Sequence, residues 1–210
     1  MTDDAPTTAA HLAQTYHDAD LPLHLMLDIE TLDTQPSALV LSAGWAWFNE
    51  NRVISSGVVS FDHQLQQRTG RTVSIDTVRW WKDQAEPMPD SKHGFDVRML
   101  DGELWRTNPR LWENTPSSEG MKDVLVWANS PSFDCVILRH WAASLQRSVP
   151  WAFWVERDFR THKYLVERAH TRHDDMTTTL HARAAAQHSA EQDARDQAQF
   201  MIDNKHLVRF

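Results

Sequence analysis

Cysteine is almost absent from this chain of 210 residues. The single thiol, Cys135, excludes an intramolecular disulfide framework, and a reducing cytoplasm is the expected compartment. Without cysteines to assist, the four histidines between residues 170 and 188 match no standard zinc spacing. We interpret Cys135 itself as a small core residue.

Long apolar runs and a targeting signal are also missing. No stretch approaches the roughly 20 apolar residues of a membrane span, so no membrane partner is expected. The N-terminal sequence MTDDAPTTAAH lacks the basic and apolar regions of a secretory signal. Residues 1–20 show no clear strand or helix pattern, and we interpret them as an extension preceding one domain at 21–210.

An excess of positive charge is absent, because the formal net charge is -8. This argues against a general nucleic-acid binder with a basic surface. Net charge nevertheless hides local patches, and a carboxylate-rich metal site counts as negative until its cations are bound. The 10 Trp and 8 Phe residues, within an apolar share of 41%, are enough for a sizeable core.

The pattern along the chain predicts strands first and then strands alternating with helices. Residues 23–29, 38–48 and 52–61 predict an antiparallel meander, with turn residues before the third segment. Residues 83–122 contain four prolines and predict loops with short elements. Further strands are predicted at 123–128 and 151–155, and helices at 72–81, 130–145, 157–169 and 189–202. This order indicates a mixed α/β sheet.

Two carboxylates interrupt the first predicted strand, which contains the sequence LMLDIETL. Asp28 and Glu30 lie on the same face, because strand side chains repeat every second residue. A carboxylate removed from water is costly unless it is paired or bound to a metal. Taken alone, the pair also fits a strand end with solvated acids.

Two later acids favour the metal-site interpretation. Asp134 lies in the first turn of the helix after the predicted strand 123–128, and Asp193 lies five residues after His188 in the first turn of the last helix. Hard divalent cations such as Mg²⁺ prefer oxygen ligands. Four acids around two cations fit the two-metal pattern for in-line attack on a phosphodiester.

These residues form three motifs in order: D-x-E at Asp28, N-x4-D ending at Asp134, and H-x4-D starting at His188. The set resembles the motifs of DEDDh 3′–5′ exonucleases of the ribonuclease H-like superfamily. The stretches ALVLSAGWAWF, TVRWW and PWAFWVERDFRT resemble the small bacterial and phage branch typified by a mycobacterial 3′–5′ exoribonuclease. The resemblance covers about residues 22–82 and 123–204. It implies an α/β domain with a mixed, roughly five-stranded sheet flanked by helices. The irregular insert at about 83–122 departs from the family pattern, which would have an amphipathic helix before the second motif.

The resemblance also implies a role for each motif residue. Asp28, Glu30, Asp134 and Asp193 would hold two Mg²⁺ or Mn²⁺ ions, with Asp28 bridging them. His188 would be the general base, a role that suits an imidazole titrating near neutrality. The implied activity is 3′–5′ removal of nucleoside 5′-monophosphates from single-stranded ends or overhangs, with RNA slightly favoured over DNA.

Candidate substrate-binding residues surround these motifs. By family analogy Leu32 would wedge against the terminal base, whereas Asn129 either contacts substrate or shapes a turn. Arg157 and Arg160 match an R-D-x-R-T stretch of the family. They lie in a basic segment, residues 157–173, that forms either a phosphate-binding strip or a solvated helix face. The acid between them, Asp158, is an alternative salt-bridge partner for an arginine.

Three tryptophans have two interpretations each. Trp47, Trp80 and Trp81 are more typical of core residues, but one of them could stack on a base, which is how proteins hold single strands without sequence choice. Related exonucleases are often dimers, so the resemblance also raises a homodimer with an interface in the Trp-rich middle of the chain.

Two other functions remain open from the sequence. One is a 3′–5′ DNA exonuclease in repair, recombination or phage replication, because no residue clearly recognises the 2′-hydroxyl that separates RNA from DNA. The other is a non-catalytic module that binds nucleic acid or a partner. The complete set of four acids with His188 argues against the second.

Overall fold

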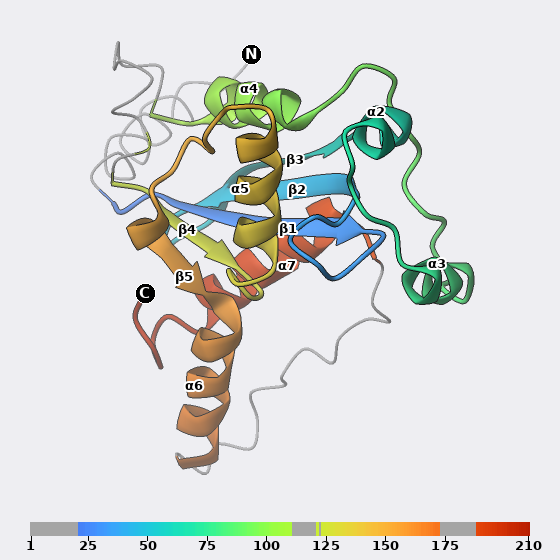
Figure 1. The fold of residues 1–210 in the computed structure, drawn as a ribbon. Coiled ribbons are helices and arrows are strands. Elements are labelled where there is room, and N and C mark those ends of the chain that lie inside the picture. Colours follow the sequence, from blue (N-terminus) through green and yellow to red (C-terminus); the bar gives the residue numbers. More distant parts are fainter. Residues whose placement is uncertain (1–20, 111–120, 122, 173–187) are drawn as a thin grey trace, which may run out of the picture.

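The computed structural model describes residues 21–110, 121, 123–172 and 188–210, and their central element is a five-stranded sheet (Figure 1). The strand order is β3-β2-β1-β4-β5. β1 pairs antiparallel with β2 and parallel with β4; β2 pairs antiparallel with β3, and β4 parallel with β5. The predicted meander and mixed sheet are therefore confirmed. The strands are β1 (His24–Thr31), β2 (Val40–Phe48), β3 (Val53–Ser60), β4 (Leu125–Ala128) and β5 (Glu156–Asp158).

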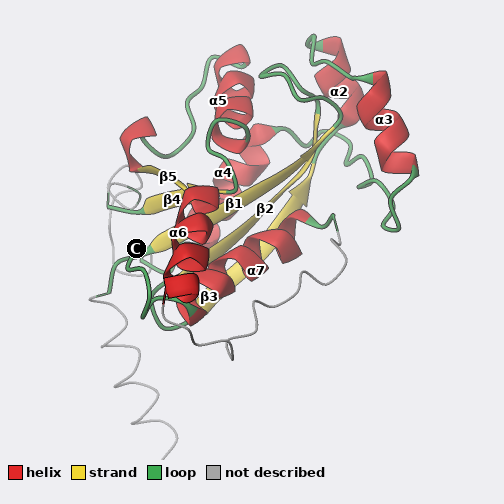
Figure 2. Ribbon diagram, turned by 90° about the horizontal axis from the view of Figure 1, so that it is seen from below, coloured by secondary structure: helices red, strands yellow, loops and turns green. Residues whose placement is uncertain are grey.

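Helices cover both faces of the sheet. α4 (Val97–Thr107) and α5 (Asp134–Ser144) lie on one face (Figure 1). α6 (Phe159–Arg172) and α7 (Ala190–Asp203) lie on the other, where Figure 2 shows them from below. Two short helices, α2 (His63–Arg68) and α3 (Ile75–Lys82), lie beyond the carboxyl end of β1.

The alternation of side chains along β1 divides the core into two layers. Leu25, Leu27 and Ile29 pack with the buried side chains of α4 and α5, whereas Met26 packs with those of α7. Since alternate strand residues share a face, the next residues on the α7 side are the two acids of β1. The fold therefore directs both carboxylates toward the helix that carries the last motif.

Small residues let α7 lie close to the sheet. Ala190, Ala194 and Ala198 are buried at helical spacing, and Met201 continues this row. A row of alanines keeps the helix backbone near the strands, because no longer side chain separates them. α7 contacts both β1 and β2, and its N-terminal turn is brought against β2, where Ala190 lies beside Gly44.

Two expectations for secondary structure were wrong. Residues 83–122 contain α4, an 11-residue helix with a side-chain N-cap at Asp96, where loops and short elements were predicted. Its buried residues are Val97, Leu100 and Leu104, and Met99 and Trp105 also pack against the core. Prolines on either side made the helical spacing of these residues hard to recognise in the sequence. The segment 151–155 forms a 3-10 turn at Phe153–Val155, and the last strand follows it.

Several predictions concern residues that the structure does not describe. The extension at 1–20 lies outside the described residues, as do parts of the insert and of the histidine-rich segment. No helix in the described part of the chain combines the length and the apolar character that crossing a bilayer requires.

Candidate active site

The carboxyl ends of β1 and β4 border a polar pocket of about 200 Å³, which we call the acid pocket. This edge is where α/β sheets commonly bind ligands. The four predicted acids and the predicted base, distant in sequence, all line it. Its lining consists of Asp28, Ile29, Glu30, Asn129, Ser130, Phe133, Asp134, Arg160, His188 and Asp193.

Asp134 reaches the pocket because β1 is longer than its neighbour. β4 ends at Ala128, which pairs with Leu27, so β1 continues without a strand partner on that side. The backbone N–H of Ile29 donates instead to Oδ1 of Asp134 at 3.2 Å. The chain turns at Ser130, whose carbonyl accepts the N–H of Asp134 at 3.2 Å, and α5 begins at Asp134 itself.

The N-terminus of α7 brings the third motif to the same place. His188 lies just before Ser189, the N-cap residue, and the N–H of Asp193 donates to the Ser189 carbonyl at 2.8 Å. Ligand atoms of Glu30, His188 and Asp193 all lie within 4.8 Å of one another. The predicted base and two of the acids are therefore close enough to act on one group.

Burial raises the pKa values of three carboxylates of the acid pocket, and repulsion between the acids adds to the rise for Asp28 and Glu30. Burial raises the pKa of Glu30 to about 8, and the charges of Asp193 and Asp134 add to this effect. Burial also raises the pKa of Asp134 to about 7, although the Ile29 N–H and the Arg160 charge oppose the rise. For Asp28, burial and then the three neighbouring acids hold the pKa well above its usual range.

Burial and mutual repulsion thus disfavour the charged form of the acids Asp28 and Glu30. Among the lining residues in the described part of the chain, Arg160 is the one cationic side chain apart from the imidazole. A dense set of oxygen donors with one nearby imidazole fits hard divalent cations such as Mg²⁺ or Mn²⁺. The donor set thus fits the ions that the motifs predicted.

Gly44 is a site residue that the sequence analysis missed. It pairs with Asp28 across β1 and β2, and a Cβ atom at this position would lie 2.1 Å from the backbone carbon of Ala190. The missing side chain therefore lets the first turn of α7 rest against the sheet beside Asp28. A lone glycine within a buried strand was the available signal, since it marks close approach of another backbone.

Gln197 was also missed. Its Nε2 donates to Oδ1 of Asp28 at 3.0 Å, so the amide holds one acid in place. The signal was its spacing, because a residue four positions after Asp193 lies on the same face of a helix. Asp28 and Asp193 are therefore linked through α7.

Some of the predicted substrate-binding residues line the acid pocket and others do not. Asn129 and Arg160 line the acid pocket, and Nη2 of Arg160 donates to the Asn129 carbonyl at 3.1 Å. Arg157 lies outside the lining, because its Nη1 donates to the carbonyls of Trp154 and Glu156. The structure thus brings only one of the two predicted arginines to the acids.

Asp158 caps a helix and does not form the salt bridge with an arginine that was considered above. Its carboxylate accepts the backbone N–H of Arg160 at 3.0 Å and the hydroxyl of Thr161 at 2.7 Å. These bonds cap the start of α6. In the R-D-x-R-T stretch, the Asp therefore holds the helix that presents Arg160.

The three candidate tryptophans differ in their exposure to solvent. Trp47 is fully buried and its Nε1 donates to Thr107, and Trp81 is buried with its Nε1 donating to the Thr31 carbonyl. Trp80 is 43% exposed, and its ring centroid lies 4.6 Å from that of His188. Leu32 is buried in a cluster with Trp81 and does not line the acid pocket.

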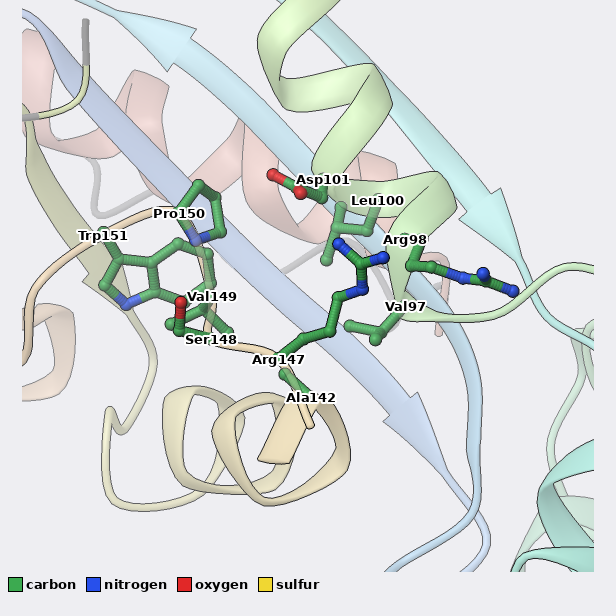
Figure 3. A pocket seen from close by; sticks show the side chains of 10 residues that line it. All are labelled: Val97, Arg98, Leu100, Asp101, Ala142, Arg147, Ser148, Val149, Pro150 and Trp151. Atoms are coloured by element: carbon green, nitrogen blue, oxygen red, sulfur yellow. The ribbon is translucent and has the colours of Figure 1, made fainter. Parts of the chain in front are cut away.

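A second hollow lies between α4 and the loop that follows α5 (Figure 3). Its volume is about 20 Å³, which is room for about one water molecule. Its walls are mainly apolar, with Arg147 extending toward α4 (Figure 3). We interpret it as a packing gap where the loop meets α4.

A family model described as a 3′-5′ exoribonuclease Rv2179c-like domain matches residues 23–203. No curated protein matches the sequence. Similar solved structures include apo exonuclease I, with a TM-score of 0.57 and 12% identity over 89% of this chain and 43% of that one. Product-bound exonuclease I gives a TM-score of 0.56 and 12% identity over 89% of this chain and 45% of that one.

The zinc-bound complex of E. coli exonuclease I with single-stranded DNA gives a TM-score of 0.55 and 14% identity, over 90% of this chain and 41% of that one. The chain thus spans less than half the length of these structures. At such low identity the likeness establishes the shared fold, a ribonuclease H-like sheet with flanking helices.

Proposed function

The chain belongs to the 3′-5′ exoribonuclease Rv2179c-like domain family, and from this membership we propose that it is a metal-dependent 3′–5′ exonuclease acting on single-stranded RNA ends. The products would be nucleoside 5′-monophosphates. One observation carries the proposal: four acids and His188, from three separate parts of the chain, converge in a single pocket. A binding module would have no need of so many mutually repelling carboxylates.

Each residue of the acid pocket has a role in this proposal. Asp28, Glu30, Asp134 and Asp193 would hold two Mg²⁺ or Mn²⁺ ions, which when bound stabilise the charge that develops on the phosphate and the leaving oxygen. His188 would accept a proton from the attacking water. Arg160, beside the acids, would contact a substrate phosphate.

The direct test uses 5′-labelled single-stranded RNA and DNA of one sequence, incubated with Mg²⁺, Mn²⁺ or EDTA. We expect a ladder that shortens from the 3′ end, requires the metal and forms faster on RNA. A faster ladder on DNA would replace the RNA assignment with the DNA exonuclease. Metal-dependent binding of both strands without any shortening would leave only a binding module.

His188→Ala tests the general base. We expect nucleotide release to slow by about 10² to 10⁴-fold, because the attacking water loses its proton acceptor. Binding of the labelled RNA, measured by fluorescence anisotropy, should be retained. His206→Ala is the control, since this exposed histidine lies after α7 and away from the acid pocket. An unchanged rate in His188→Ala would remove the proposed role.

Gln197→Leu tests the support of Asp28. Leucine is similar in size but cannot donate to the carboxylate, so we expect Mn²⁺ affinity, measured by calorimetry, to fall about 10-fold or more. Gln199→Leu is the matched control, because Gln199 is exposed on the same helix and donates to Asp203 instead. Equal Mn²⁺ affinities for the two variants would show that the bond to Asp28 has no effect on the metals.

A further inference from the structure

Two adjacent aromatic side chains, Phe153 and Trp154, face solvent just before β5. They are 68% and 67% exposed, and both belong to the 3-10 turn at the start of this segment. Large aromatic groups bury most of their surface in most folds, so two exposed side by side mark a candidate binding surface. Trp151 before the turn and Val155 at its end are buried. The core therefore anchors both ends of the turn and leaves the aromatic pair outside.

The aromatic pair is held in place before any ligand binds. Its two rings meet edge to face, with centroids 5.2 Å apart and planes at 81°. The N–H of Val155 donates to the Ala152 carbonyl at 3.2 Å, which closes the turn. Nη1 of Arg157 donates to the Trp154 carbonyl at 2.9 Å and ties the turn to β5. Binding on these rings would order little of the protein, which lowers its entropic cost.

Two arginines lie in the segment between the aromatic pair and the acid pocket. Arg157 bonds the turn, whereas Arg160 lines the pocket, where its charge also acts on Asp134. Their printed hydrogen bonds run to neutral backbone carbonyls, and neither forms an ion pair with a carboxylate among the residues that the structure describes. Both guanidinium groups are thus positioned and able to meet a phosphate.

β5 connects the aromatic pair to the acid pocket. The turn comes before Glu156, the first residue of β5, and α6 follows Asp158, the last. Asp158 pairs with Ala128, the last residue of β4, whose carboxyl end borders the pocket. Both acids of β5 are already bonded, because Glu156 accepts Nε1 of Trp151 at 2.9 Å and Asp158 caps α6. An anionic strand along this edge would therefore meet the two arginines.

We propose that Phe153, Trp154 and Arg157 form an upstream track, which binds the part of the substrate strand on the 5′ side of its reacting end. This inference rests on the proposed exonuclease function. The strand would leave the acid pocket past Arg160, place a phosphate on Arg157 and stack its bases on the aromatic pair. Stacking uses the π-face that all bases share, so the track would hold RNA without selecting its sequence.

The length of the strand gives the test, because a short RNA fills the acid pocket without reaching the track. A 5′-fluorescein trimer and a decamer with the same 3′ end are compared by anisotropy with Mg²⁺, in an Asp193→Asn background. We expect the decamer to bind about 10-fold more tightly or better. Replacing both Phe153 and Trp154 with alanine should remove most of this gain and leave trimer binding at the level of the parent protein.

A modified decamer separates stacking from phosphate contacts. Its upstream nucleotides carry abasic riboses, so it keeps the phosphates and the 3′ end but has nothing to stack. It should bind the parent and the double alanine variant equally, and less tightly than the ordinary decamer binds the parent. Phe95→Ala is the aromatic control, because this side chain is 38% exposed before α4 and outside the track. It should bind every strand as the parent does.

Arg157→Gln tests the phosphate contact. It should weaken binding of both decamers, and the slope of log affinity against log salt should become shallower by about 0.7, as for one lost contact to a single strand. Arg157→Lys keeps the charge and should recover most of that slope. Arg106→Gln is the matched control, since Arg106 is paired with Glu103 on α4. It should leave both the affinity and the slope unchanged.

The competing occupant of the aromatic pair is a protein surface, including a second copy of this chain. Sedimentation velocity without RNA addresses it. An assembly that wild type forms and the double alanine variant loses, together with unchanged decamer affinity, would assign the pair to an interface between copies and overturn the track. Equal decamer affinities for the parent and the double alanine variant would overturn it as well, whatever the assembly.

The outcomes for the track and for the proposed function are distinguishable. If wild-type protein with Mg²⁺ shortens no strand, yet the gain from strand length requires the aromatic pair, the track stands and the exonuclease proposal falls. If wild-type protein shortens RNA while the double alanine variant keeps the full gain from strand length, the exonuclease stands and the track falls.

Discussion

Replacing Asp193 with alanine is expected to abolish nucleotide release while leaving the protein folded. Asp193 lies in the first turn of α7, with a ligand atom within 4.8 Å of those of Glu30 and His188. Its loss removes one of the four carboxylates that would hold the cations, and the remaining three cannot supply the same charge and geometry. Single-turnover release from labelled RNA in Mg²⁺ measures the effect.

The metal-free stability of the same variant provides a second, independent result. The charge of Asp193 contributes to the raised pKa values of both Asp28 and Glu30, so its removal relieves repulsion. We therefore expect Asp193→Ala in EDTA to unfold at the same temperature as wild type or a higher one. Added Mn²⁺ should stabilise wild type, by linkage to binding, but stabilise the variant much less.

Asp196→Ala is the matched control for both measurements. Asp196 is exposed on the same helix and accepts a hydrogen bond from Gln192. It should keep both the wild-type rate and the wild-type response to Mn²⁺. A folded Asp193→Ala protein that releases nucleotides at the wild-type rate would rule out the proposed site.

The residues proposed to carry the chemistry were predictable from the sequence because they interrupt regular patterns. Asp28 and Glu30 break an apolar strand at alternate positions, and strand geometry alone places them on one face. Asp134 follows a strand and begins a helix, so the edge of the sheet was its expected location. The structure places these acids together with His188 and Asp193 in one pocket.

The supporting residues were harder to predict because they act through contacts between distant elements. Gln197 matters because α7 crosses β1, and its amide then lies beside Asp28. Arg157 and Arg160 occur in one motif, yet only Arg160 lines the pocket, since Arg157 bonds to nearby carbonyls. Trp80 and Trp81 are adjacent in sequence but differ in burial, which depends on how α3 packs against the end of β1. Neither the hydrophobic periodicity of the sequence nor the secondary-structure propensity of its residues encodes such differences.

Replacing Gly44 with alanine is expected to impair the site as strongly as losing its proposed catalytic groups. The added Cβ would lie 2.1 Å from the backbone carbon of Ala190 and 2.3 Å from the backbone nitrogen of Glu191. Backbone atoms cannot rotate away as the end of a side chain can, so the first turn of α7 must move off the sheet. That turn carries His188 on one side and Asp193 on the other, and both would move away from Glu30.

The expected cost has two components. Overpacking at a buried contact typically destabilises a protein by about 1–3 kcal/mol, and a clash with backbone belongs at the upper end of that range. Activity should fall by at least as much as in His188→Ala, because two pocket residues are displaced together. Chemical denaturation measures the stability, and release from labelled RNA measures the activity. Mn²⁺ affinity, measured by calorimetry, should fall as well.

Gly102→Ala separates this effect from a general response to losing a glycine. Gly102 lies within α4, and an added Cβ there meets no atom within 4 Å. Because alanine favours helix more than glycine does, this variant should be stabilised by about 0.5–1 kcal/mol at unchanged activity. If Gly44→Ala instead matched wild type in stability, Mn²⁺ affinity and rate, α7 would not need its close contact with β2 to form the site.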